Sequence, residues 1–216
     1  MPHSVSDHSG ATVYGENIKL LRETGRLSSA RWCPSPNFGA RPEGAAISLL
    51  VVHSISLPPG QFGGRYIEDF FTNRLNPTEH PYFSTVADMR VSAHALIRRD
   101  GAVVQFVSLL ERAWHAGRSC FQGVEECNDF SIGIELEGAD DVPYTPEQYR
   151  SLSELTMVIT SAWPAVTSDR ITGHCDIAPG RKTDPGPAFD WHGFRASLQA
   201  DKPGRHVRKL AHKGAL

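Results

Sequence analysis

The sequence is 216 residues long and carries 22 Lys and Arg residues against 24 Asp and Glu residues, a formal net charge of −2. Hydrophobic residues make up 40% and charged residues 21%, which is typical of a globular domain with a full core. A charge so close to zero gives no reason to expect nucleic acid or an anionic membrane as a partner.

The two ends of the sequence differ from its middle. The first residues lack a basic stretch followed by an apolar one, and no apolar run approaches the roughly 18 residues of a transmembrane helix. We therefore expect a cytoplasmic protein with one domain at 29–200. A polar extension at 1–28, in which 16–22 could form a short helix, precedes it, and a basic, solvated tail at 201–216 follows it.

The four cysteines give no sign of a redox or metal motif. Cys33, Cys120, Cys127 and Cys175 contain no CxxC pair. The spacing of Cys120 and Cys127 would allow a disulfide, but in a reducing cytoplasm we expect free thiols.

The first half of the domain carries strand, helix and hairpin signals. Residues 46–52 are a short apolar run, which predicts a strand buried on both faces, and Pro and Gly punctuate the loop after it. Apolar residues between 66 and 71 fall on one face of a helix. Residues 91–107 predict a β-hairpin, because Asp100 and Gly101 separate two apolar runs.

The second half carries one strand and two helices. Residues 130–137 alternate between apolar and polar, which predicts a half-buried strand with Ser131, Gly133, Glu135 and Glu137 on its exposed face. A capping box at 145–148 begins a helix, and Asp190 could cap a last one. Hairpin strands among helices predict an α/β (α+β) domain with a mixed central β-sheet flanked by helices.

Two histidines and an aspartate suggest a metal site. His53 follows an apolar run and is expected at a strand end, where α/β folds tend to place their sites. His174 follows a second short run, and Asp184 lies in the Pro- and Gly-rich loop after it. Two imidazoles and one carboxylate are a common ligand set for a catalytic zinc ion, because they leave a fourth position open. Lys182, beside the last ligand, could stabilise an oxyanion.

Two carboxylates on the polar face of the strand at 130–137 are candidates for the general base. Hydrolysis needs one carboxylate aimed at a water molecule, and both Glu135 and Glu137 point the same way from the strand. Their periodicity does not choose between them.

An iron site is an alternative for the same segment. His174 and Asp176 form an HxD pattern, and His192 could complete the facial triad of a non-haem iron oxygenase. That triad normally lies in an all-β barrel, whereas this sequence predicts helices.

Five segments resemble one enzyme family. The segments are VVHSISLPPGQFGG (51–64), VSAHALIRRDGAVVQFV (91–107), RAWHAGRS (112–119), CNDFSIGIELEG (127–138) and TGHCDIAPGRKTDPGPAFDW (172–191). In order and spacing they resemble the zinc-dependent N-acetylmuramoyl-L-alanine amidases, and within them the cytosolic AmpD type, which recycles anhydromuropeptides in Gram-negative bacteria. The resemblance runs from about residue 31 to about residue 194.

This resemblance implies a role for each candidate residue. The zinc ligands would be His53, His174 and Asp184, the acid and base would be Glu135, and Lys182 would stabilise the oxyanion. Phage relatives place a catalytic tyrosine where this sequence has Ala93, which leaves proton transfer to Glu135. The implied substrate contacts are Ser54, where the AmpD type often has asparagine, and Arg90, Trp114 and Arg181.

The activity implied by the resemblance is hydrolysis of the amide between N-acetylmuramic acid and L-alanine, with the 1,6-anhydro form preferred. The expected cofactor is Zn²⁺ and the expected partner is the anhydromuropeptide, bound by a monomer without nucleic acid or membrane. A periplasmic amidase of intact cell wall, or a peptidoglycan-binding module that does not cut, are the alternatives. A binding module typically lacks a zinc ligand, whereas all three are in place here.

Overall fold

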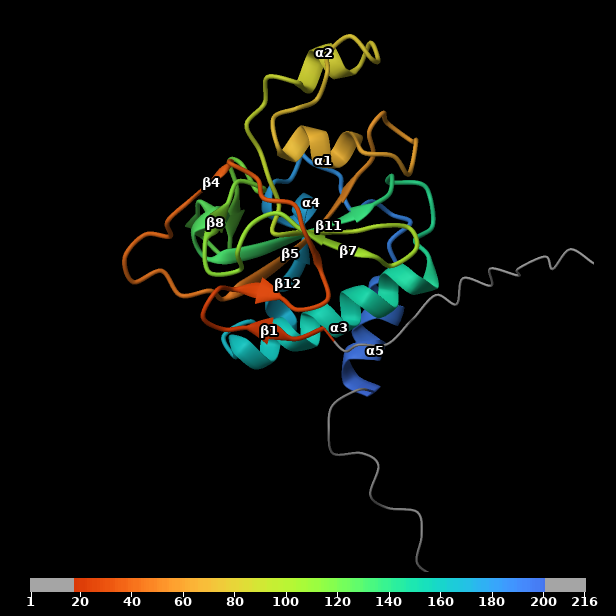
Figure 1. Cartoon of the computed structure of the whole chain (residues 1–216). Helices are drawn as coiled ribbons and strands as arrows, with labels where there is room; N and C mark the ends of the chain where they lie inside the picture. Colours follow the sequence, from red (N-terminus) through yellow and green to blue (C-terminus); the bar gives the residue numbers. More distant parts are fainter. Residues whose placement is uncertain (1–17, 201–216) are drawn as a thin grey trace, which may run out of the picture.

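A six-stranded mixed β-sheet forms the centre of the protein in a computed structural model that describes residues 18–200 (Figure 1). The strand order is β12-β5-β11-β6-β7-β3. The two long central strands, β5 (Leu49–Ile55) and β11 (Ser131–Glu137), run parallel. The shorter strands of this sheet are β3 (Arg31–Trp32), β6 (Ala95–Ile97), β7 (Val103–Gln105) and β12 (Ile171–Gly173). The predicted mixed sheet flanked by helices is confirmed.

Short elements surround this sheet. Three two-stranded ribbons pair β1 with β2, β4 with β8 and β9 with β10. Their bounds are β1 (Leu20–Leu21), β2 (Arg26–Leu27), β4 (Phe38–Gly39), β8 (Arg112–Ala113), β9 (Cys120–Phe121) and β10 (Val124–Glu125). The single-turn helices are α2 (Phe83–Val86), α4 (His174–Ile177), η1 (Cys127–Asp129) and η2 (Ser168–Arg170).

The helices begin where local sequence signals place them. Helix α3 (Pro146–Ala162) starts at the predicted capping box, in which Thr145 Oγ1 accepts a hydrogen bond from the backbone N–H of Gln148. Helix α5 (Trp191–Ala200) follows Asp190, whose side chain accepts one from the N–H of Gly193. Helix α1 (Tyr66–Phe71) buries the apolar face that its sequence predicts. The hairpin is confirmed too, because β6 pairs antiparallel with β7.

The sheet has two faces. The apolar face carries Leu50, Val52, Ile132 and Ile134, and the other, which we call the functional face, carries His53, Ser131, Glu135 and Glu137. Helices α3 and α5 cover the apolar face (Figure 1), where Leu50 and Val52 of β5 join Ile132 and Ile134 of β11 in the main core. Helix α1 lies on the other side, over the β6 and β7 end of the sheet. The central strands are nevertheless buried on both faces, β11 along its whole length and β5 as far as His53, as parallel strands usually are.

This double cover corrects one prediction. Strand β11 is buried along its whole length rather than half-buried, although the alternation of its apolar and polar residues is as predicted. Its polar face is covered by other residues instead of by water: His115 packs over Gly133, and Arg98 and backbone groups contact Glu137. Periodicity reports which side chains share a face, but it does not report what covers that face.

The N-terminal part of the described chain differs from its prediction. The helix expected at 16–22 is wrong for the described residues, because Leu20 and Leu21 pair with β2 as a strand. Ile18 and Leu27 are buried in the main core, so residues 18–28 pack on the domain expected at 29–200. The remainder of the predicted extension, 1–17, and the basic tail, 201–216, lie outside the described residues.

Two further properties concern the chain as a whole. All four cysteines lie in the described range and are free thiols. Between residues 18 and 200, no helix has the length and apolar character needed to cross a membrane.

Glu137 is the centre of a buried polar network. Its carboxylate binds Arg98 at 3.0 Å and accepts hydrogen bonds from the N–H groups of Gly63 and Arg99. Arg98 in turn binds Glu68 of α1 at 2.6 Å. The network ties strand β11 to the loop before α1, which assigns Glu137 a structural role.

We expect Glu137→Gln to lower the free energy of unfolding by about 3 kcal/mol, because it leaves Arg98 without one of its buried partners. Urea denaturation of the variant and the parent measures the difference. The exposed Glu125 is the control, and Glu125→Gln should change stability by less than about 0.5 kcal/mol. Equal stability of the Glu137→Gln variant and the parent would contradict the structural role.

Candidate active site

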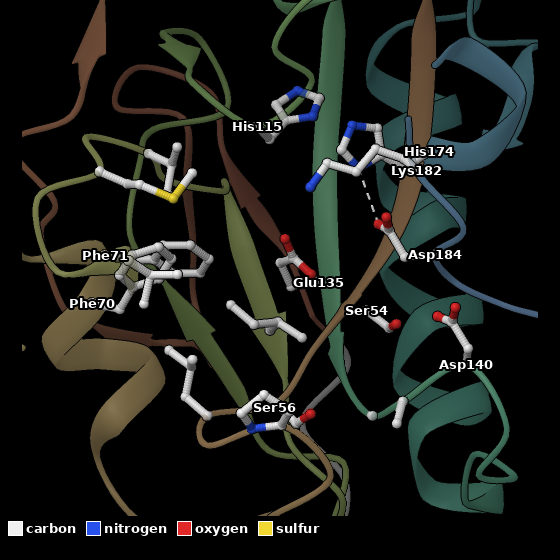
Figure 2. Close-up of a pocket in the computed structure, with 18 of the residues that line it drawn as sticks. Ser54, Ser56, Phe70, Phe71, His115, Glu135, Asp140, His174, Lys182 and Asp184 are labelled. Carbon is white, nitrogen blue, oxygen red and sulfur yellow. Dashed lines mark hydrogen bonds and ion pairs between the residues drawn. The ribbon is translucent and has the colours of Figure 1, made fainter. Parts of the chain in front are cut away.

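A cavity of about 570 Å³ opens on the functional face of the sheet, beside the carboxyl ends of β5 and β11. Phe70 and Phe71 lie on one wall, which is apolar (Figure 2), and Trp114 also belongs to the lining. The other wall is polar and includes Glu135 and Asp184 (Figure 2). A cavity of this size, lined by both apolar and polar side chains, has room for a small-molecule ligand.

The register of the two central strands sets the base of this cavity. His53 and Glu135 are direct partners across the parallel β5–β11 pair. Paired residues of neighbouring strands point to the same face, so the imidazole and the carboxyl group lie side by side. His53 was expected at a strand end, but β5 continues for two residues beyond it to Ile55.

Three potential metal ligands converge at one point. His174 lies directly after β12, and Asp184 returns to it in the following loop, where the N–H of Cys175 donates to the Asp184 carbonyl. His174 Nδ1 lies 3.0 Å from Asp184 Oδ2 and 3.0 Å from His53 Nδ1, and His53 Nδ1 lies 3.3 Å from the same carboxylate oxygen. This is the set of residues that sequence analysis predicted.

These distances fit a zinc ion. Ligand atoms at the corners of a tetrahedron, each about 2.0–2.1 Å from zinc, are separated by about 3.3 Å. The second nitrogen of His174, Nε2, faces the carbonyl of Ala116 at 3.1 Å. A carbonyl only accepts, so Nε2 carries the proton and Nδ1 presents a lone pair to the Asp184 carboxylate. Two acceptors held this close favour a cation between them.

The protonation states also suit a metal. Burial lowers the pKa of His53 to about 4, and the neighbouring His174 acts in the same direction, so this imidazole is neutral at pH 7. Burial opposes ionisation of Asp184, but a proton or cation on the imidazole side of its contacts with His174 and His53 outweighs burial and holds its pKa below the usual range. A neutral imidazole and an ionised carboxylate are the ligand forms that zinc requires.

Glu135 places a buried carboxyl group in the cavity. Its side chain is 8% exposed, and Oε2 has no hydrogen-bond partner among the described residues. Burial raises its pKa well above the usual value, and the charge of Asp184 adds to the rise, whereas Lys182 opposes it. A carboxyl group with a raised pKa holds a proton more readily, which suits proton transfer near neutral pH.

Lys182 lies at the rim of the same cavity. Its side chain is exposed and lines the cavity, and Figure 2 shows it reaching over from the Asp184 side. The structure therefore brings together all five residues predicted as zinc ligands or catalytic groups.

The predicted substrate contacts divide into two groups. Ser54 and Trp114 line the cavity. Arg90 and Arg181 do not belong to its lining: the Arg90 guanidinium donates to the carbonyl of Ala87, and that of Arg181 donates to the carbonyls of Ala116 and Arg118.

The residues of the iron alternative do not meet. The Asp176 carboxylate accepts hydrogen bonds from Thr172 and from the N–H of Gly173, so it caps the single turn α4. His192 is exposed on α5. Among residues 18–200, the potential metal ligands that cluster are His53, His174 and Asp184.

Sequence reasoning missed His115. This residue lines the cavity, and its Nδ1 lies 2.9 Å from His53 Nε2. The RAWHAGRS segment that contains it carried part of the family resemblance, but only Trp114 was assigned a role there. A histidine next to a cavity-lining tryptophan was the available signal.

Comparisons with known proteins agree with this geometry. The family model for N-acetylmuramoyl-L-alanine amidase matches residues 43–187. The chain is 56% identical over 182 residues to 1,6-anhydro-N-acetylmuramyl-L-alanine amidase AmpD of Escherichia coli. The matched residues cover 84% of this chain and 99% of that protein.

Solved structures give the same result. The crystal structure of a selenomethionine AmpD derivative matches with a TM-score of 0.79 and 56% identity, covering 81% of this chain and 97% of the other. A complex of AmiD from E. coli with anhydro-N-acetylmuramic acid-L-Ala-D-γ-Glu-L-Lys matches with a TM-score of 0.53 and 30% identity, covering 72% and 59%. The chain therefore belongs to the N-acetylmuramoyl-L-alanine amidase family of hydrolases.

Proposed function

We propose that this chain is a zinc-dependent amidase that cleaves the bond between N-acetylmuramic acid and L-alanine in soluble 1,6-anhydromuropeptides. The observation that carries the proposal is the convergence of His53, His174 and Asp184 beside Glu135, whose Oε2 has no hydrogen-bond partner within residues 18–200, at the base of a cavity. The high identity to AmpD, over nearly its whole length, supports the same substrate class.

The metal and the protein would divide the chemistry. A zinc ion held by His53, His174 and Asp184 would supply a Lewis acid that polarises the scissile carbonyl and acidifies a water molecule. Glu135 takes the proton of the attacking water and returns it to the leaving amine of L-alanine. Lys182 stabilises the negative charge that develops on the carbonyl oxygen.

The cavity walls suit the two halves of a muropeptide. Phe70, Phe71 and Trp114 offer an apolar surface for a sugar ring or a lactyl methyl group, and Ser54 offers a short hydroxyl on the other side. Arg90 follows Met89, which lines the cavity, so its guanidinium could reach a carboxylate farther along the peptide. For Arg181 the backbone contacts favour a role in holding the loop that bears Lys182. The substrate roles of Arg90 and Arg181 stay predictions.

The setting of the reaction follows from the substrate. Anhydromuropeptides are soluble products of wall breakdown, so we propose a cytoplasmic recycling enzyme that acts as a monomer. The rival function is hydrolysis of intact peptidoglycan outside the cytoplasm. Purified protein incubated with anhydromuropeptides and, in parallel, with purified sacculi, followed by mass spectrometry of both, separates the two.

We expect the purified protein to hold about one zinc ion per chain, as three protein ligands with an open fourth position predict. Asp184→Ala, His53→Ala and His174→Ala should each remove most of the metal, which elemental analysis measures. Asp176→Ala is the matched control, because Asp176 lies in the same segment but caps a backbone turn. Full zinc occupancy in the Asp184→Ala variant would contradict the ligand set.

We expect Glu135→Gln to bind zinc normally but to lower kcat by at least about 100-fold, because the amide cannot accept a proton. Lys182→Ala should also keep zinc and lose roughly 100-fold in kcat. Glu137→Gln is the comparison, because it removes a carboxylate from the same face of β11 but outside the group of proposed metal ligands. Its kcat should fall much less than that of Glu135→Gln. Near-normal turnover by Glu135→Gln would disprove the assigned base.

We expect soluble anhydromuropeptides to be cleaved with a far higher kcat/KM than intact sacculi. Arg90→Ala should raise KM for peptides that carry diaminopimelate more than for peptides truncated before it, because a charge-assisted contact is lost. Equal kcat/KM on the two substrates would favour the cell-wall amidase instead.

A further inference from the structure

A chain of buried hydrogen bonds leads away from the His53 ligand. His53 Nε2 lies 2.9 Å from His115 Nδ1, and His115 Nε2 lies 3.1 Å from Ser131 Oγ. The Ser131 hydroxyl in turn contacts the backbone carbonyl of Cys127 at 2.5 Å. His53, His115 and Ser131 are each no more than 9% exposed. These hydrogen bonds therefore connect Nε2 of His53 to the protein backbone through buried groups.

The far end of this chain fixes the proton positions. The Cys127 carbonyl can only accept, so the Ser131 hydroxyl donates to it. Ser131 Oγ then accepts from His115, which places the His115 proton on Nε2 and leaves Nδ1 with a lone pair. That lone pair accepts from His53 Nε2. His53 Nδ1 is consequently left without a proton, and it is this atom that faces His174 and Asp184.

We propose that His115 and Ser131 form a positioning relay that holds His53 in the tautomer and orientation required to bind zinc through Nδ1, and thereby sets the zinc affinity of the site. The proposal rests on the proposed zinc site and adds two residues to it. Neither residue is a ligand, and neither takes part in the chemical step. Both act through His53.

Two neighbouring residues hold His115 in this position. A Cβ atom at Gly133 would lie 2.4 Å from the His115 ring, so only glycine at this position leaves space for the imidazole. Asn128 Oδ1 accepts hydrogen bonds from the N–H groups of His115 and Ala116, which fixes the loop that carries the ring. Ser131, Gly133 and Glu135 share one face of β11. On this face Ser131 accepts the hydrogen bond from His115, Gly133 leaves space for the His115 ring, and Glu135 is the proposed base.

The two histidine ligands are held differently. His174 donates to a fixed backbone carbonyl, that of Ala116. His53 donates to a second imidazole, which accepts only while its own proton stays on the far nitrogen. The His53 side therefore depends on side chains that substitution can change, and a hydrogen-bond partner of a metal ligand typically contributes 10- to 100-fold to metal affinity.

Zinc affinity tests the relay, measured by competition with a chelator. His115→Phe keeps a ring of similar size but removes the acceptor, and it should weaken zinc binding roughly 10- to 100-fold. His115→Gln offers an amide oxygen to His53 and should recover part of that loss. Ser131→Ala removes the anchor of His115 and should cause a smaller loss. Ser153→Ala is the matched control, since Ser153 is a buried serine that contacts Ser197 on the opposite side of the sheet.

A spectroscopic test needs no substitution. Long-range ¹H–¹⁵N spectra of the zinc-loaded parent should show His115 protonated on Nε2 and bare at Nδ1. A proton on His115 Nδ1 would overturn the relay even if His115→Phe did not fold. With excess zinc, kcat of Ser131→Ala should return to the parent value, as a positioning role requires.

The relay and the zinc site can fail separately. If the parent protein bound no zinc, the proposed function would be wrong and the relay with it. If the parent bound zinc and both His115→Phe and Ser131→Ala bound it equally well, only the relay would be wrong.

Discussion

The parallel pairing of β5 with β11 is the constraint on which the site depends. In this register His53 lies beside Glu135, and Val51 lies beside Gly133, over which His115 packs. A slip of one residue would turn every side chain of one strand to the opposite face and separate His53 from Glu135. The register is in turn fixed by the apolar residues of both strands, which face α3 and α5. The hydrophobic core thus sets the geometry of the polar site.

The two faces of the sheet have opposite energetic roles. Burying imidazoles and carboxyl groups is unfavourable unless each is hydrogen-bonded or paired. On the functional face most of them are: Glu137 binds Arg98, and His174 donates to a backbone carbonyl. The apolar face supplies the free energy that offsets the remainder, through the aliphatic contacts of β5 and β11 with α3. The sheet between them holds His53 and Glu135 on adjacent strands, whereas loops that pack on the sheet bring in His115 and Asp184.

The sequence predicts the local features well and the long-range contacts less well. The capping box at Thr145 and the hairpin at Asp100 are decided by neighbouring residues, so pattern alone identifies them. The cluster of His53, His174 and Asp184 was predicted because the residue types and the family resemblance pointed to the same chemistry. Burial of the polar face of β11 was missed, because what covers it comes from residues distant in sequence. The contact between His115 and Ser131 was missed for the same reason, because no local sequence pattern predicts a hydrogen bond between side chains 16 residues apart.

The charge balance around Glu135 links the remaining features. Burial and the nearby Asp184 carboxylate both favour the protonated form of Glu135, and the Lys182 ammonium opposes them. A base must lose its proton before it can accept one, so in the proposed mechanism further positive charge is needed beside Asp184. A divalent cation between Asp184 and the two histidines would provide it and would lower the pKa of Glu135. In the proposed mechanism the metal site and Glu135 therefore depend on each other: a cation held by His53, His174 and Asp184 would also determine whether Glu135 can act as the base.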